Sequence, residues 1–150
     1  MATTRPHKLA ECVDCACFAI RRAARVVTQH YDRALRPSGL RVTQFTMLTM
    51  LALSGPTPLK QVADRLAMER TTLTRNLRPL MANGLVTVEP GDDRRVRRIA
   101  VTAKGQRAAA AALPLWRSAQ RAVATELSST VLASLHTAAR VLPGIRARTD

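Results

Sequence analysis

Aromatic side chains are scarce in this 150-residue chain, at 3% of its residues. Hydrophobic residues still make up 47%, so a core must be built from leucine, valine, alanine and methionine, a composition that favours helices. No run of about 18 apolar residues occurs, so the sequence predicts no membrane-spanning helix. The first 14 residues also lack the apolar centre of a signal peptide. We therefore expect a cytoplasmic protein whose residues 1–150 form a single domain.

Acidic residues are few, with 10 Asp and Glu against 24 Lys and Arg and a formal net charge of +14. Such an imbalance favours a polyanionic partner, with nucleic acid first and an acidic membrane surface second. Arginine is far more common than lysine, which suits bidentate contacts to phosphate and guanine. The motif described below favours nucleic acid, and we expect no membrane partner.

Motifs for catalysis are missing as well. The sequence has no phosphate-binding loop, no pair of histidines at metal-ligand spacing and no defensible Ser/His/Asp arrangement, so we expect no enzymatic activity and no cofactor. Three cysteines in a reducing compartment are free, redox-active or inert rather than a disulfide framework. On one continuous helix Cys17 would point roughly 140° or more away from Cys12 and Cys15, so we expect no metal site there.

What the sequence does contain is an ordered motif in residues 57–104, which reads as helix, short turn, helix, strand, arginine-rich turn and strand. Thr57 is expected to cap the first helix, with Pro58 at its first position, where the missing N–H costs little. The second helix is expected from Glu69 to Ala82. This order is typical of a winged helix-turn-helix. The predicted fold class is mainly α with a small two-stranded β wing, plus a helical dimerisation domain.

The second helix of this motif has two distinct faces. Leu73, Leu77 and Leu80 lie within roughly 60° of one another on a helical wheel, so they should pack inward. The opposite face holds short hydroxyls and arginines: Thr71, Thr74, Arg75 and Arg78, with Arg70 and Thr72 at its edge. Such a face suits the DNA major groove, where arginine reads guanine and threonine offers a hydroxyl and a methyl group. The alternative is a solvated basic surface.

Alternating apolar and polar residues predict strands at 85–89 and 96–102, joined by a turn with proline and glycine. Arginine crowds this hairpin, and the residues expected at DNA are Asp93, Arg94, Arg95 and Arg97. A wing tip that carries arginine can enter a narrow minor groove, where the potential is most negative. Asp93 is expected to hold the Arg95 guanidinium by a charge-assisted hydrogen bond. The alternative is a soluble, charged turn.

The order of these pieces closely resembles the MarR family of bacterial transcriptional regulators. The matching pieces are Leu66-Ala67, residues 71–75, Gly84-Leu85-Val86, Asp93-Arg94-Arg95 and residues 101–105. With the flanking helices, the resemblance covers about residues 10–145. It implies a homodimer that binds double-stranded DNA.

Long helices are predicted on both sides of the motif. Residues 8–35 should form one helix with a heptad-like seam, which consists of Val13, Cys17, Ile20, Ala24, Val27 and Tyr31. A short helix is expected from Thr43 to Leu53. Thr102 is expected to cap the next long helix, and Ser128 or Ser129 the last one.

The apolar stripes of these long helices need a partner, which is why a homodimer is expected. We assign residues 41–101 to the winged helix-turn-helix DNA-binding region, and residues 8–35 and 102–143 to dimerisation. Two-fold symmetry then predicts a palindromic operator whose half-sites are about 10 bp apart or a little more.

The sequence leaves two kinds of regulatory signal open, a bound small molecule and cysteine oxidation. MarR-like dimers often bind a small aromatic acid or similar anion between the dimer helices and the DNA-reading module, and an arginine there could pair with a carboxylate. The candidates for lining such a site are Arg21, Arg22, Arg25, His30, Tyr31, Gln44 and Met47.

The second class is cysteine oxidation, for which the candidates are Cys17, Cys12 and Cys15. Cys17-Phe18 resembles the reactive pair of the organic hydroperoxide resistance regulators, a MarR subfamily, and Tyr31 matches a tyrosine that supports the cysteine there. Arg21 and Val42 stand where that subfamily has two further tyrosines. The interpretation we favour is that Cys17 is a small core residue on the heptad seam.

These patterns together predict a sequence-specific DNA-binding repressor that a small aromatic or anionic ligand releases from its operator. A repressor that senses organic peroxide through cysteine is the first alternative. A non-specific architectural DNA-binding protein is the second. The two-faced helix argues against the latter, because non-specific binding needs only charge.

Overall fold

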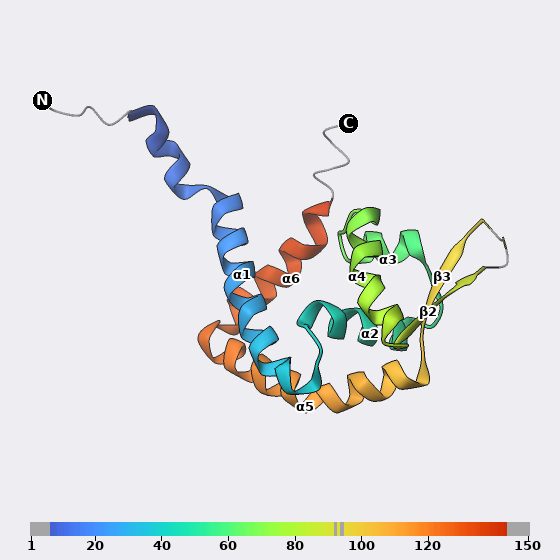
Figure 1. The fold of residues 1–150 in the computed structure, drawn as a ribbon. Helices are drawn as coiled ribbons and strands as arrows, with labels where there is room; N and C mark the ends of the chain where they lie inside the picture. The colour runs from blue at the N-terminus through green and yellow to red at the C-terminus, as the bar shows by residue number, and fades with distance from the viewer. Residues whose placement is uncertain (1–6, 92, 94, 144–150) are drawn as a thin grey trace, which may run out of the picture.

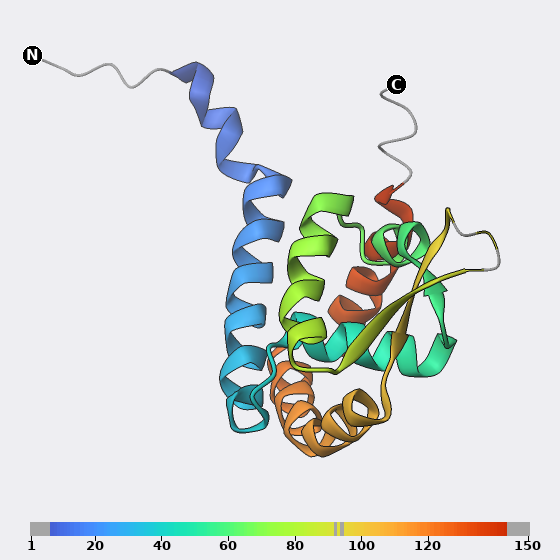
Figure 2. The same ribbon diagram turned by 45° about the vertical axis from the view of Figure 1, so that its right-hand side comes forward.

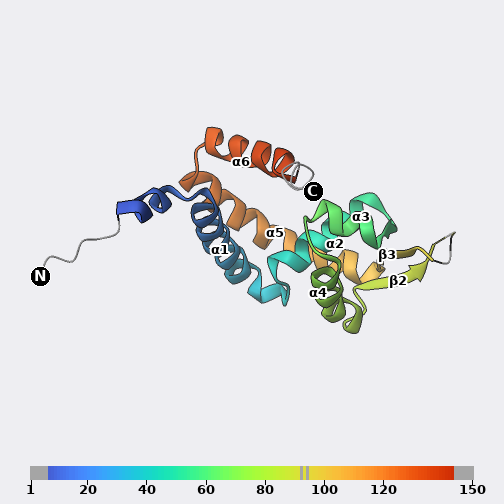
Figure 3. The ribbon, with the colours of Figure 1, turned by 90° about the horizontal axis from the view of Figure 1, so that it is seen from above.

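The chain forms two groups of elements that one long helix, α5, connects (Figure 1). The computed structural model describes residues 7–91, 93 and 95–143. α1 and α6 stand at one end of α5, and α2, α3, α4 and a small sheet gather at its other end (Figures 1 and 3). In chain order the elements are η1 (His7–Asp14), α1 (Ala16–Leu35), η2 (Arg36–Ser38), α2 (Val42–Ser54), β1 (Thr57–Pro58), α3 (Leu59–Arg65), α4 (Arg70–Ala82), β2 (Val86–Pro90), β3 (Arg97–Val101), α5 (Ala103–Glu126) and α6 (Ser129–Val141).

The hydrophobic core lies where α2, α4 and the sheet meet the first half of α5. Its leucines are almost wholly buried and include Leu48 and Leu51 of α2. Leu73, Leu77 and Leu80 of α4 join them, which confirms the predicted inward face of that helix. Phe45 stacks on Trp116 with ring centroids 6.0 Å apart, so the few aromatic residues help to join α2 to α5.

The sheet has three antiparallel strands in the order β1-β3-β2, one more than the predicted wing hairpin. The third strand is β1, in which Thr57 is 2% exposed and pairs with Ile99. The prediction that Thr57 caps a helix was therefore wrong, because pairing with β3 keeps this segment extended and α3 begins only at Leu59. The two wing strands pair in the register Val88↔Ile99 and confirm the predicted hairpin.

The first predicted helix is interrupted near its start. Residues 7–14 form the 3-10 helix η1, Cys15 is extended (φ −64°, ψ 112°), and α1 begins at Ala16. The expectation of one continuous helix over 8–35 was wrong, and the seam from Val13 to Cys17 does not lie on a single helix. The described side chains on both sides of the break are exposed, so tertiary packing within the chain does not hold this segment in the α form.

The start of α5 is locked to the end of α4. Thr102 is the N-cap, as predicted, and its hydroxyl oxygen accepts a hydrogen bond from the Gly105 N–H at 3.0 Å. The same hydroxyl donates to the Gly84 carbonyl at 2.7 Å. Lys104 Nζ donates to the Asn83 carbonyl at 2.8 Å. These hydrogen bonds join the start of α5 to the segment between α4 and β2.

α1 packs along α5, and Tyr31 marks the contact. Tyr31 is buried and its hydroxyl donates to Gln120 Oε1 of α5. Burial raises the pKa of Tyr31 above its ordinary value, because the phenolate loses hydration there. Its predicted place on the packing seam of the first helix is confirmed.

α6 differs from the other α-helices because none of its residues is buried in the single chain. Ser128 caps it, as predicted, by accepting the Val131 N–H at 3.3 Å. Val131 and Leu135 of α6 remain 44% and 50% exposed. Within the described part of the chain, no helix is long and apolar enough to cross a bilayer.

Candidate nucleic-acid interface

The outward face of α4 presents the side chains that the sequence singled out. Arg70, Thr71, Thr74, Arg75 and Arg78 are exposed, and Thr72 is half-buried. Thr74 donates its hydroxyl hydrogen to the Arg70 carbonyl at 2.9 Å. The Thr74 oxygen therefore remains an acceptor and its methyl remains available for apolar contact. Because α4 contains no acidic residue, this face is uniformly cationic or neutral.

A tight turn sets the position of α4 against α3. Ala67 has a φ of 49°, in the left-handed region, and the Met68 N–H returns to the Ala63 carbonyl at 2.9 Å. Asn76 of α4 donates to the Met68 sulfur at 3.7 Å, which ties the turn to the helix that follows. α4 begins at Arg70, with Glu69 as its N-cap, as the sequence indicated. The turn therefore leaves the first residues of α4 outside the core.

The wing hairpin is narrow at its tip. The Gly91 N–H donates to the Val96 carbonyl at 2.6 Å, and Asp93 Oδ1 accepts the backbone N–H of Arg95 at 2.9 Å. Asp93 therefore fixes the turn backbone, whereas the prediction assigned its carboxylate to the Arg95 guanidinium. A backbone N–H two residues on is the nearer donor in an Asx turn, which explains the difference. Arg95 and Arg97 are exposed, and the predicted contact Arg94 lies outside the described residues.

α4 and the wing are joined through a shared hollow of about 400 Å³. Arg70, Thr74 and Arg78 of α4 line it with Arg97 of β3. The structure thus brings together the predicted contacts from the helix and those from the wing. Figure 2 shows the wing projecting on one side of α4, with α1 on the other side.

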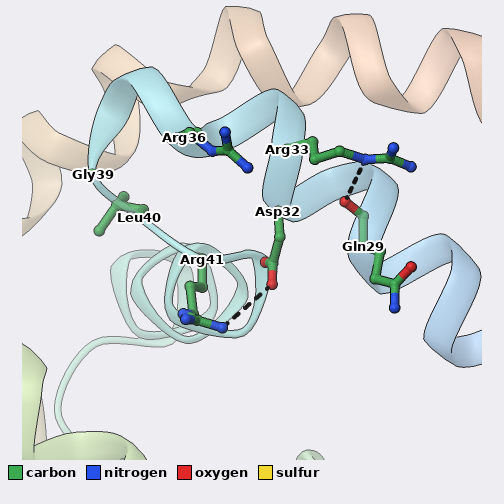
Figure 4. A pocket seen from close by; sticks show the side chains of 7 residues that line it. All are labelled: Gln29, Asp32, Arg33, Arg36, Gly39, Leu40 and Arg41. Atoms are coloured by element: carbon green, nitrogen blue, oxygen red, sulfur yellow. Dashed lines mark hydrogen bonds and ion pairs between the residues drawn. The ribbon is translucent and has the colours of Figure 1, made fainter.

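Three arginines near this surface were not singled out by the sequence patterns. Arg33, Arg36 and Arg41 line a hollow of about 500 Å³ at the corner between α1 and α2 (Figure 4). A signal was present in the sequence, since two of these arginines flank the Pro37-Ser38-Gly39 break. Only the fold shows that the corner lies beside α4.

The candidate effector residues lie at several places. Arg21, Arg22 and Arg25 are exposed on α1, and Tyr31 is buried against α5. His30 lines a cavity of about 640 Å³ between α1 and the end of α5, and its Nε2 atom is buried without a hydrogen-bond partner in the described structure. Gln44 accepts the Arg41 N–H at 2.9 Å, and Met47 is fully buried.

The cysteines occupy the break before α1. Cys12 lies in η1, Cys15 precedes α1 and Cys17 lies in its first turn, and all three are free and exposed. The favoured interpretation of Cys17 as a core residue was therefore wrong for the single chain. No cluster of three histidine, cysteine or acidic side chains suited to a metal occurs among the residues described here.

A recognition helix preceded by a tight turn and followed by a two-stranded wing defines a winged helix-turn-helix protein. The sequence model of the MarR family matches residues 38–96, from η2 to the wing. A solved structure of the M. tuberculosis transcriptional regulator MosR in complex with DNA is 43% identical, with a TM-score of 0.80, over 89% of this chain and 99% of that chain. The chain belongs to the MarR family of transcriptional regulators.

Two further comparisons agree with this assignment. Another crystal structure of M. tuberculosis MosR has a TM-score of 0.74 at 43% identity and covers 87% of this chain and 98% of that one. YwoH of Bacillus subtilis (strain 168), described as an uncharacterised helix-turn-helix transcriptional regulator, is 30% identical over 88 residues. That match covers 59% of this chain and 64% of YwoH, slightly under two-thirds of the length of that relative.

Proposed function

We propose that this protein is a sequence-specific DNA-binding repressor that acts as a homodimer on a palindromic operator. The observation that carries the proposal is the exposed face of α4, where Thr71, Thr74, Arg75 and Arg78 stand clear of the core on a helix of major-groove size. The wing arginines Arg95 and Arg97 would contact the minor groove and backbone beside it. The 43%-identical MosR, solved in complex with DNA, supports the same partner.

The homodimer is supported by apolar surface that the single chain leaves uncovered. Large hydrophobic side chains are exposed on η1, α1 and α6: Val13, Phe18, Ile20, Val26, Val131, Leu135 and Val141. So much apolar surface on one part of a small protein is typical of an association site. A second copy that covers α1 and α6 would place two α4 helices on one side of the dimer and so require two half-sites.

The releasing signal that we propose is a small aromatic or anionic ligand. The cavity between α1 and α5 offers apolar walls from Val26, Val123 and Leu127, together with the Nε2 of His30, which has no hydrogen-bond partner among the described residues. A few polar groups in an apolar cavity are typical of small-molecule sites. Because α5 is locked to the end of α4 at Thr102, a change in the α1–α5 packing would alter the spacing of the two recognition helices.

The test is fluorescence anisotropy with the duplex immediately upstream of the protein's own gene, at physiological salt and with excess scrambled duplex. Saturable nanomolar binding that survives the competitor is expected for a specific regulator. Aromatic acids should then weaken binding. If excess scrambled duplex abolishes binding of the operator duplex, the protein has only general DNA affinity and this operator is rejected. Release by organic hydroperoxide in place of aromatic acids would favour sensing through the exposed cysteines.

A further inference from the structure

α4 lies between two flanking structures. Figures 2 and 3 show the wing on one side and the α1–α2 corner on the other. On the wing side, Arg78 and Arg97 line the shared hollow. On the corner side, Arg75 of α4 and Arg41 at the start of α2 line a second hollow of about 260 Å³. An arginine from a neighbouring element therefore accompanies α4 along each flank.

The width of the DNA major groove determines what lies beside a recognition helix. An α-helix with its side chains is about 10–12 Å across, and the major groove is about 12 Å wide. A recognition helix in the groove therefore has a phosphate ridge along each of its flanks. If the wing contacts the phosphate backbone on one side of the groove, the element on the opposite flank of α4 contacts the phosphate backbone on the other side. In this fold that element is the α1–α2 corner.

The corner carries the charge that such a contact requires. The hollow is lined by three guanidinium groups, those of Arg33, Arg36 and Arg41, and by one carboxylate, that of Asp32, which leaves a net charge of +2 (Figure 4). Asp32 is already engaged: its Oδ1 accepts the Val42 N–H at 2.8 Å, and its Oδ2 lies 3.8 Å from Arg41. Arg36 makes no ion pair or side-chain hydrogen bond within the part of the chain that the structure describes.

We propose that Arg41 and Arg36 bind the phosphodiester backbone of DNA on the flank of α4 opposite the wing, a contact that extends the protein–DNA interface to the α1–α2 corner. Arg41 is the link, because it lines both the hollow beside Arg75 and the hollow at the corner. The Arg41 side chain is 78% exposed, so the corner is too open to bury most of a small anion but is open enough for a duplex. This inference rests on the proposed DNA binding.

The experiment compares the salt dependence of DNA binding for the full chain and for the double variant Arg36→Gln/Arg41→Gln. Each lost phosphate contact lowers the slope of log K against log salt by about 0.9, so two contacts lower it by about 1.8. Between 50 and 200 mM salt, the wild type should then lose about 12-fold more affinity than the variant. At low salt, the double variant should lose the same factor of affinity for the operator as for a scrambled duplex, because phosphates carry no sequence information.

The control removes the same charge elsewhere. The variant Arg107→Gln/Arg117→Gln changes two exposed arginines of α5 that line neither hollow, and it should keep the wild-type slope. The variant Arg36→Lys/Arg41→Lys restores both positive charges and should restore most of the slope, which separates a lost contact from a damaged fold. Light scattering should give the same mass for all the variants.

Three outcomes overturn the proposal. Binding by the wild type together with an equal slope for the Arg36/Arg41 and Arg107/Arg117 variants would reject the corner contact and leave the proposed function intact. If the Arg36→Gln/Arg41→Gln variant keeps the wild-type slope but binds inorganic phosphate or benzoate more weakly than the wild type by calorimetry, the corner is a small-anion site instead. If the wild type binds no duplex at all, the proposed function and this inference both fail.

Discussion

Gly105, in the first turn of α5, has no room for a side chain, and Gly105→Ala should destabilise the protein strongly. A Cβ at this position would lie 2.1 Å from the Leu85 carbonyl oxygen and 2.8 Å from Val101 Cγ2. The side chain of Val101 could adjust by a small amount. The Leu85 oxygen belongs to the backbone and accepts the Thr102 N–H at 3.0 Å, so the contact is relieved only if α5 moves away.

The magnitude follows from three contributions. Overpacking costs about 1–3 kcal/mol, and the upper end applies here because the obstacle is a backbone atom. Displacing the start of α5 weakens the hydrogen bond between Thr102 and Leu85, at about 1 kcal/mol. The higher helix propensity of alanine returns at most about 1 kcal/mol. The net loss in the free energy of unfolding is about 3 kcal/mol, or about 6–12 °C in Tm for a chain of this size.

The assay is thermal and urea unfolding followed by circular dichroism, with every variant at one protein concentration because the stability of a dimer depends on concentration. Gln106→Ala, at the exposed neighbouring position, is the matched control and should shift the free energy of unfolding by no more than about 0.5 kcal/mol. A Gly105→Ala protein as stable as the wild type would refute the reasoning, since α5 would then not approach Leu85 this closely in solution.

Three other changes test the interface, the α1–α5 contact and the core. Arg75→Ala should weaken operator binding by about 1–3 kcal/mol and relax specificity at one base pair, measured by anisotropy on single-base operator variants. Because burial raises the pKa of Tyr31, the unfolded state loses that proton first as the pH rises through about 10, so the free energy of unfolding should fall above this pH. Tyr31→Phe should remove that part of the fall in urea titrations. Leu73→Ala, at a fully buried position, should cost about 2–5 kcal/mol of unfolding free energy, measured by the same titrations.

Each of these predictions has a contradicting result. A uniform loss of affinity across all operator variants would show that Arg75 touches only phosphate. Identical pH profiles for the wild type and Tyr31→Phe above pH 10 would show that the phenol is not buried in solution. A change below about 1 kcal/mol for Leu73→Ala would mean that the core around α4 collapses to fill the space.

Local signals in the sequence determined much of this protein. The 3.6-residue period of the leucines in α4 indicated which face is buried, and the opposite face followed from it. Hydroxyl residues at Thr102 and Ser128 marked helix starts that the structure confirms, because capping depends only on residues three or four positions away. Alternation on both sides of a proline and glycine turn located the wing. The family resemblance rested on the order of these same pieces.

Only the tertiary structure decided the remainder. Thr57 is a strand residue because it pairs with Ile99 of β3. That partner lies far along the chain, so the residues around Thr57 could not indicate the pairing. The break at Cys15 lies in a segment without proline or glycine between His7 and Leu35, so local composition did not mark it. Arg41 and Arg75 line the same hollow only because the turns around α3 return α4 to the start of α2. Periodicity gives the direction of a side chain on its own helix, whereas the neighbours of that side chain depend on how the helices pack.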